Sequence, residues 1–258
     1  VFNREVTGIN VIDWIVWSRS ENWFLGRYCQ AFEIAYYNLA QNLIAKFVTI
    51  IPSLSWKILL PLLSEQEGED HSKQNTKLRQ TYQNSVRYSA FIMFPIIIYF
   101  FVSSYELIVI LYGQAFAPVH AVFQVLCLGA LFSCIAQPGS AAIYATGRQK
   151  FILKFGAILA IINIIMNFIL IPSYGAFGAS ICYTSVTTMG VLGGFWFLKK
   201  EMNLCPPWLS ILKIGMYALF SGMLLFWALR QPAEWFQLHH SIIEFGHNLS
   251  DGIIKKVY

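Results

Sequence analysis

Apolar residues gather along the chain into blocks of about 20, the length that crosses the hydrocarbon core of a bilayer as a helix. Short polar connections separate these blocks. Inside lipid every backbone N–H and C=O must be bonded within its own segment, so the blocks are predicted to be α-helices. We expect complete spans at residues 36–63, 88–112, 119–146, 151–171, 176–198 and 208–229. The end of a further, partial span is expected before them, near Ile15.

Lys and Arg residues alternate between rich and poor connections. The connections after the first, third and fifth spans carry several, whereas those after the second and fourth carry none. Positive residues concentrate on the cytoplasmic side of membrane proteins. We therefore predict that the loops at 64–84, 147–154 and 199–207 are cytoplasmic and that the first span runs from outside to inside.

Three segments follow from this topology. Residues 1–35 are predicted to hold the end of the preceding helix and an outer connection, and residues 36–229 a six-helix transmembrane lobe. Residues 230–258 are expected to form an outer loop and an amphipathic or non-native tail, since their apolar positions recur at helical spacing but are too polar to span. The chain begins with Val1, so we expect it to be a fragment of a longer protein.

Composition narrows the class of protein further. The chain has 258 residues, of which 57% are apolar and 12% are charged, against about 25% charged in soluble domains. The net charge is +5, and the Lys and Arg residues that produce it lie mainly in the connections predicted to be cytoplasmic. We therefore predict no nucleic-acid partner. The five cysteines show no metal-binding spacing, and we found no signature of a hydrolase, metalloprotease or nucleotide-binding enzyme. We therefore predict no enzymatic activity, no metal and no cofactor.

One face of the first span carries polar residues at steps of three and four: Asn38, Asn42, Lys46, Thr49 and Ser53. A lysine exposed to lipid at mid-membrane costs roughly 2.5–3.5 kcal/mol. The face must therefore contact other helices or water. A polar seam with a snorkelling Lys is one interpretation, and the wall of a water-filled cavity is the one we favour.

Weaker polar stripes mark later spans, and we interpret them as ordinary helix contacts. Their members are Gln137, Ser140 and Tyr144 on the third span, Asn163 and Asn167 on the fourth, and Ser180, Thr184 and Thr187 on the fifth. Charged residues also cluster before the first span. Among them, Asp13 and Glu33 are either interfacial charges or carboxylates that couple transport to an ion.

Five short runs, in order, resemble a known family of polysaccharide repeat-unit flippases. They are IDWIVWSRSENWFLGRYCQAFEI, TIIPSLSWKILLPLLSE, IVILYGQAF, AIYATGRQK and NFILIPSYGAFGASICYT. The family belongs to the multidrug/oligosaccharidyl-lipid/polysaccharide exporter superfamily. The resemblance covers residues 9–198 and implies a fourteen-helix fold in two lobes, of which this chain supplies most of the second.

The resemblance also implies a function, which is to move an undecaprenyl-diphosphate-linked oligosaccharide across the inner membrane of a bacterium by alternating access. Lys46, Arg19 and Arg27 would then hold the diphosphate, and amide and hydroxyl side chains would hold the sugars. Expected partners are this lipid-linked oligosaccharide, membrane lipids, a polysaccharide polymerase and a chain-length regulator.

Three alternatives remain open. A cation-coupled multidrug antiporter of the same superfamily would need an acidic cavity, and the candidate residues for it are Asp13 and Glu33. A membrane polysaccharide polymerase would want a long outer loop, which the predicted topology lacks. A truncated remnant without function is the third.

Overall fold

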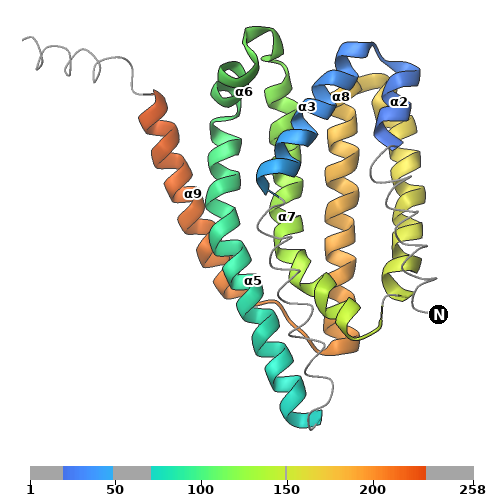
Figure 1. The fold of residues 1–258 in the computed structure, drawn as a ribbon, viewed down its shortest axis with the longest axis vertical. Coiled ribbons are helices and arrows are strands. Elements are labelled where there is room, and N and C mark those ends of the chain that lie inside the picture. Colours follow the sequence, from blue (N-terminus) through green and yellow to red (C-terminus); the bar gives the residue numbers. More distant parts are fainter. Residues whose placement is uncertain (1–19, 49–70, 149, 231–258) are drawn as a thin grey trace, which may run out of the picture.

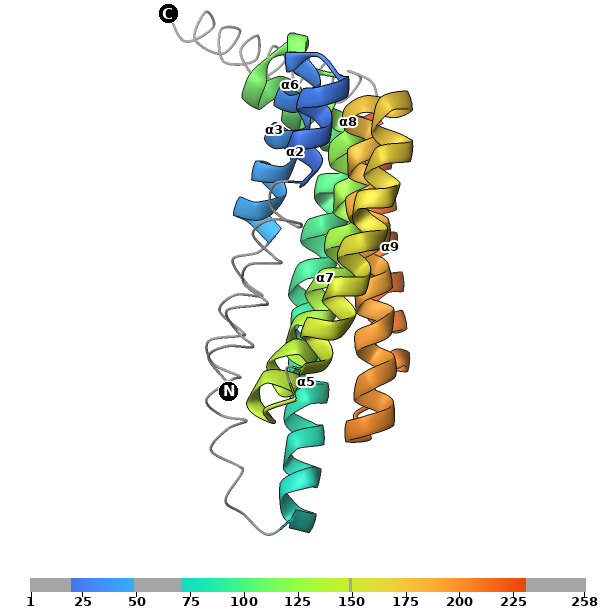
Figure 2. The ribbon, with the colours of Figure 1, turned by 90° about the vertical axis from the view of Figure 1, so that its right-hand side faces the viewer.

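The computed structural model describes residues 20–48, 71–148 and 150–230. In this part of the chain the secondary structure is helical, without a strand, and its long helices stand side by side as an upright bundle (Figures 1 and 2). This agrees with the all-α fold that the apolar blocks predict.

The first two helices form a hairpin at one end of the bundle. Helix α2 covers Ser20–Tyr28, and α3 covers Ala31–Val48. The sequence assigned residues 1–35 to the end of a preceding helix and an outer connection. The described part of that segment is largely helical, and only Cys29 and Gln30 separate α2 from α3. Helix α2 is polar and buries Ser20 and Glu21 against another helix, so hydropathy alone does not reveal it.

Helix α5 covers His71–Val102. It begins 17 residues before the predicted span 88–112 and ends ten residues before that span does. It breaks at Ser103 and resumes as the short helix α6, Ser104–Tyr112. The predicted cytoplasmic loop at 64–84 is therefore helical from His71 onward, since a polar helix beyond the bilayer leaves no hydropathy signal. A 3₁₀ turn, η3 (Gln114–Phe116), leads into the next helix.

Helix α7, Val119–Ala145, lies at the centre of the bundle and packs against α3, α5 and the next helix, α8. Its buried side chains include Phe123, Leu126 and Cys127. Pro138 lies inside it, as predicted for a transmembrane helix in which neighbouring groups replace the lost hydrogen bond. The bounds agree with the predicted span 119–146.

Helix α8, Lys150–Met202, is two antiparallel helices joined at Gly175 (Figure 2). Gly175 has φ 54° and ψ −133°, a conformation that glycine adopts without a Cβ clash. The prediction of a tight turn between the fourth and fifth spans is confirmed. We call this end of the bundle the Gly175 end.

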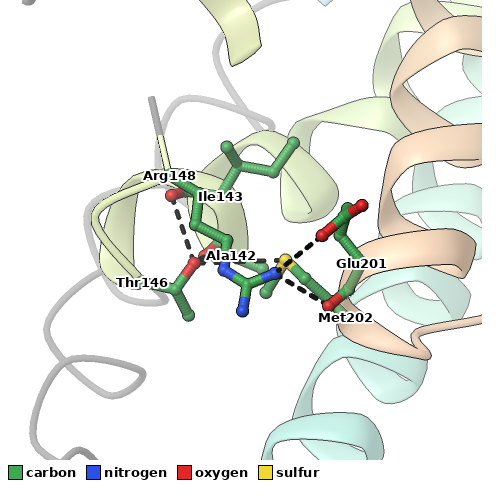
Figure 3. A network of polar contacts seen from close by, with 6 residues as sticks. All are labelled: Ala142, Ile143, Thr146, Arg148, Glu201 and Met202. Atoms are coloured by element: carbon green, nitrogen blue, oxygen red, sulfur yellow. Dashed lines mark hydrogen bonds and ion pairs between the residues drawn. The ribbon is translucent and has the colours of Figure 1, made fainter. Parts of the chain in front are cut away.

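The opposite end, which we call the Arg148 end, brings together the α7–α8 turn and the last residues of α8 (Figure 3). The Arg148 guanidinium donates a hydrogen bond of 2.7 Å to the carbonyl of Glu201 and lies 3.8 Å from its carboxylate. Both side chains are about half exposed, so the ion pair contributes at most about 1 kcal/mol. It links the α7–α8 turn to the last residues of α8.

Helix α9, Trp208–Arg230, leaves the Arg148 end and packs mainly on α5. Four described helices are long and apolar enough to cross a membrane: residues 79–102, 119–145, 150–202 and 208–227. The third of these crosses twice, because it reverses at Gly175. Large apolar side chains such as Ile110 and Leu209 are about 80% exposed, as lipid-facing residues are. The chain is a multi-pass membrane protein.

Candidate functional site

The polar face of α3 runs down the helix from the Gly175 end. Asn38 is half-buried, and its side-chain oxygen accepts a hydrogen bond of 3.1 Å from the Asn22 amide. Asn42 and Lys46 are exposed on the surface of the lobe. Lys46 follows Ala31 by 15 residues, which places it roughly 22 Å along the helix. At that depth a lipid-facing ammonium would be costly, so this surface is suited to water or another part of the protein.

Arg27 is also exposed, but it lies near the end of α2, and its guanidinium carbon is 6.0 Å from the centre of the Tyr28 ring. Because α2 and α3 form a hairpin, Arg27 stays close to the Gly175 end while Lys46 lies about 20 Å deeper. The structure therefore does not join these two cations into one anion site. Arg19, Asp13, Thr49 and Ser53 fall outside the described residues.

Glu33 has a structural partner at the Gly175 end. Its carboxylate accepts a hydrogen bond of 2.7 Å from the Ala176 backbone N–H, at the start of the second half of α8. A carboxylate at this position accepts a hydrogen bond from a backbone N–H that has no partner within the helix. The positive end of the helix dipole also stabilises its negative charge. Ion coupling by Glu33 stays a prediction, whereas capping is the contact that the structure gives it.

Burial and the Glu33 carboxylate also raise the pKa of the neighbouring Cys29 thiol. The protonated thiol donates to the carbonyl of Ile171, near the α8 reversal, over 3.6 Å. All five cysteines of the chain are free.

A buried carboxylate, Glu21 on α2, lies against the first half of α8, and the sequence did not single it out. Only 2% of its surface is exposed. The Asn163 amide donates 3.1 Å hydrogen bonds to both the Glu21 carboxylate and the Ser20 hydroxyl. Asn167 donates to Ser20 over 3.4 Å. Asn163 and Asn167, predicted to be ordinary helix contacts, do join α8 to α2, and they form a polar cluster around Glu21.

Two tyrosines, Tyr37, which is buried, and Tyr183, which is partly buried, extend this cluster toward the interior of the lobe. Tyr37 on α3 and Tyr183 on the second half of α8 both lie in the electrostatic field of Glu21. The side chain of Gln41, on α3, lies near the Tyr183 hydroxyl. The polar groups therefore continue across three helices, from α2 through α3 to α8.

Within the described part of the chain, no Lys or Arg pairs with Glu21. A buried carboxylate without a basic partner is stabilised by a proton or a small cation. The oxygens of Glu21, Ser20 and the two Asn side chains are suitable acceptors for either. No group of three or more His, Cys, Asp or Glu in the described ranges is placed to hold a metal ion.

Two cavities lie elsewhere in the described lobe. One, of about 340 Å³, lies between α7 and the second half of α8, with Gln137, Ser140 and Thr187 among its lining residues. These three were predicted to be ordinary helix contacts. Thr184, which belongs to the same predicted stripe as Thr187, does make an ordinary helix contact. Its hydroxyl donates a hydrogen bond to the Val125 carbonyl, from α8 to α7.

The other cavity is an apolar groove of about 810 Å³ between α5, α7 and α9. Its lining consists of side chains such as Phe94, Phe101 and Met216. Its chemistry suits hydrocarbon and offers no polar partner from those side chains.

Comparisons with known proteins agree with this architecture. Residues 1–121 match the family described as "Polysaccharide biosynthesis protein". An uncharacterized membrane protein of Methanocaldococcus jannaschii is 28% identical over 64% of this chain and 33% of its own length. The teichuronic acid biosynthesis protein TuaB of Bacillus subtilis is 20% identical over 78% of this chain and 41% of its own.

Among solved structures, the lipid II flippase MurJ in an inward closed conformation is similar, with a TM-score of 0.72 and 17% identity. The similarity covers 95% of this chain and 52% of that protein, and it shows a shared fold. This chain thus spans about a third to two fifths of the length of its curated relatives and half of the solved structure.

Proposed function

We propose that this chain, which is similar to a polysaccharide-biosynthesis family and shares the fold of a lipid II flippase, forms one lobe of a lipid-linked oligosaccharide flippase of the multidrug/oligosaccharidyl-lipid/polysaccharide exporter superfamily. The cargo is an undecaprenyl-diphosphate-linked repeat unit. It moves from the cytoplasmic to the outer leaflet by alternating access, in a path between this lobe and a second one. The step is transport, and no covalent bond changes.

The observation that carries the proposal is the exposed polar face of α3. Asn42 and Lys46 lie on the surface of a membrane-embedded lobe, at a depth where contact with lipid is unfavourable. A second lobe facing α3 would enclose water between the two. In that space the Lys46 ammonium attracts a diphosphate, and the Asn42 amide can bond sugar hydroxyls.

Glu21 supplies a means of driving the cycle. A flippase that alternates between two states needs a ligand that binds one state better than the other. Uptake of a proton or a small cation by the buried carboxylate changes the charge at the α2–α8 contact, and so favours one packing of these helices. The Glu21 cluster replaces Glu33 as our first candidate for coupling, since Glu33 already caps a helix.

The orientation follows from charge. Described Lys and Arg residues near the Arg148 end include Arg148, Lys150, Lys154, Lys199 and Lys200. We place this end in the cytoplasm and the Gly175 end outside, in the inner membrane of a bacterium. A polymerase and a chain-length regulator would then act on the cargo after its release outside.

Lys46→Ala in the full-length protein tests the proposal. A hydrogen bond to a charged group contributes about 1.5–3 kcal/mol, so binding of the diphosphate should weaken roughly tenfold to a hundredfold. Polysaccharide export should fall accordingly, and Lys46→Arg should restore most of it. The measurement is surface polysaccharide per cell at equal protein level.

Lys154→Ala is the matched control, because Lys154 is an exposed lysine of the Arg148 end, away from the α3 face. Export should be unchanged in this variant. Normal export in Lys46→Ala would contradict a cationic cavity and, with it, the proposed cargo site.

A multidrug antiporter remains the second candidate, because the buried Glu21 would serve equally well to exchange a proton for an organic cation. Efflux of a cationic dye separates the two functions. If the protein is a flippase, the wild type should export no more dye than the Glu21→Gln variant. If it is an antiporter, Glu21→Gln should abolish dye efflux and Lys46→Ala should leave it unchanged.

A further inference from the structure

The cavity between α7 and the second half of α8 has no assigned role, and its lining is neutral and partly polar. Its volume of about 340 Å³ is at the lower end of the roughly 300–1,000 Å³ that small-molecule pockets occupy. Gln137 and Ser140 line it and are half-exposed, so the cavity reaches the surface of the described lobe. Thr187 also lines it, but its hydroxyl oxygen is enclosed in the wall. Gln137 and Ser140 are therefore the side chains that can bond a molecule in this space.

The lining predicts the chemical class of that molecule. None of the described residues that line the cavity is ionisable, so the lining offers no partner for a full charge. The Gln137 amide and the Ser140 hydroxyl each provide both a donor and an acceptor, as sugar hydroxyls do. Val191 and Phe195 add an apolar surface for the C–H groups of a sugar ring. The cavity therefore suits a neutral sugar better than a phosphate or a cation.

Gly194 shows on which side of the lobe the cavity lies. Leu192 and Trp196, both 59% exposed, are each two residues from Gly194 and so lie roughly 160° from it around the helix. Ala176, whose N–H is bonded to Glu33 of α3, is 18 residues away, about five full turns, and shares the face of Gly194. The cavity therefore lies on the side where α3 packs, away from the apolar exterior of this helix.

Depth along the helices places the cavity level with Lys46. The bonded pair Glu33 and Ala176 gives a common starting level for α3 and the second half of α8. At a rise of about 1.5 Å per residue, Lys46 lies roughly 20 Å from that level. The cavity extends from roughly 16 Å at Thr187 to roughly 27 Å at Gly194. Figure 1 shows α3 running down from the Gly175 end over the upper part of the bundle, so the cavity continues from there toward the Arg148 end.

We propose that this cavity is a sugar subsite, which holds the sugar nearest the diphosphate while Lys46 holds the diphosphate itself. The inference rests on the proposed flippase function. Because the cavity extends toward the Arg148 end, the subsite receives the cargo as it enters from the cytoplasmic side. Gln137 and Ser140 exchange hydrogen bonds with the sugar hydroxyls, and no covalent bond changes.

The affinities of two lipids that differ only in the glycan test the subsite. They are undecaprenyl diphosphate and the undecaprenyl-diphosphate-linked repeat unit isolated from the cells that make it, each measured with the purified full-length protein. A hydrogen bond between neutral groups changes an affinity by about twofold to tenfold. Gln137→Leu and Ser140→Ala should each weaken binding of the repeat unit by that factor and leave the affinity for undecaprenyl diphosphate unchanged.

Thr187→Val is the matched control for these two variants. It removes a hydroxyl from the same lining, but one that is enclosed and does not reach the space. Both affinities should stay at their wild-type values in this variant.

Filling the cavity tests the subsite without removing a polar group. A Cβ atom at Gly194 would meet no other atom within 4 Å, so Gly194→Leu places a side chain in the open space. This variant should lose the preference for the repeat unit over undecaprenyl diphosphate. Gly156→Leu, on the first half of α8, also meets no atom within 4 Å at its Cβ but lies outside the lining, and should keep that preference.

Protection of a thiol locates the sugar directly. In a cysteine-free full-length protein, Ser140→Cys is labelled with a water-soluble maleimide in the presence of either lipid. The repeat unit should protect this thiol, and undecaprenyl diphosphate should not. Leu192→Cys, outside the cavity lining, should be unaffected by both lipids.

The outcomes separate this inference from the proposed function. Unchanged or equal affinities for the two lipids in Gln137→Leu overturn the sugar subsite, even if Lys46→Ala weakens both and so supports the flippase. Selective loss of the repeat unit in Gln137→Leu, with normal affinities in Lys46→Ala, supports the subsite and contradicts the cationic site. A Ser140→Cys thiol that no reagent reaches in the lipid-free protein shows that another part of the protein fills the cavity, which also overturns the inference.

Discussion

Glu21 is buried where α2 meets the first half of α8, and amide and hydroxyl groups stabilise it there. Its partner Asn163 is 142 residues away in the chain. In the sequence, Glu21 is one of several charged residues at the end of an apolar block, and nothing local distinguishes it from an exposed carboxylate. The two Asn residues at a spacing of four were visible, but without their partner they resembled an ordinary seam.

Glu21→Gln should separate folding from coupling. The glutamine amide keeps an oxygen for the Asn163 donor, so the helices should still pack and the protein should reach the membrane in normal amount. It cannot take up or release a proton. Transport should lose its dependence on the pH gradient, measured as flipping of lipid-linked oligosaccharide in vesicles with and without an ionophore.

The control for this variant is Glu106→Gln, because Glu106 is an exposed carboxylate near the start of α6. It should transport as the wild type does. A Glu21→Gln protein with full, gradient-dependent transport would show that the buried carboxylate is a structural residue only.

At the scale of elements, the apolar pattern predicted the helices that are apolar along their whole length. Helices α7 and α9 and the two halves of α8 begin and end within a few residues of the predicted spans. The pattern did not reveal α2 or the first turns of α5, because these are polar helices, and hydropathy reports burial in lipid and not helicity.

The break at Ser103 is a different case. Ser103 and Ser104 are buried within an apolar run, so no change in hydropathy marks the point where α5 ends and α6 begins. The reversal at Gly175, in contrast, was visible from its Pro and Gly residues. A turn made by Pro and Gly can be predicted from its own residues. A break inside a buried apolar segment depends on the helices around it, and the local sequence does not show it.

Gly175→Ala should destabilise the reversal that joins the two halves of α8. An L-residue at φ 54°, ψ −133° costs about 1–3 kcal/mol. The added Cβ would also come within 2.6 Å of the Glu33 carboxylate oxygen that caps Ala176. We expect a lower midpoint of thermal unfolding for the purified full-length protein.

Gly156→Ala provides the comparison, since its helical backbone and open surroundings accept a methyl group. Its unfolding midpoint should match or exceed the wild type. If Gly175→Ala were as stable as Gly156→Ala, the reversal would not depend on glycine.

At the scale of the whole molecule, the described lobe presents surfaces of two kinds. Most of its exterior is apolar, with exposed side chains such as Ile165 and Phe220. The α3 face is the exception, since it exposes Asn42 and Lys46. A single lobe has no reason to combine these surfaces in one membrane. The proposed second lobe, packed opposite α3, would give each its proper solvent, and the solved structure that shares this fold is about twice as long.

The sequence predicted the α3 face from its spacing, and the structure places Asn38, Asn42 and Lys46 on α3, with the last two exposed. It did not predict the separation of Arg27 from Lys46, because depth along a hairpin depends on where the turn falls. The sequence grouped Arg27 with Lys46 through the family resemblance, and the position of the turn at Cys29 and Gln30 could not be read from it.

The most direct test of the account is the exposure of Asn42 to water. In a cysteine-free full-length protein, Asn42→Cys is compared with Ile165→Cys, a position 54% exposed on the apolar exterior of α8. Labelling with a water-soluble maleimide in intact membranes should be rapid at position 42 and slow at position 165, since only the first faces an aqueous path between lobes. Rapid labelling at 165 with none at 42 would contradict the account.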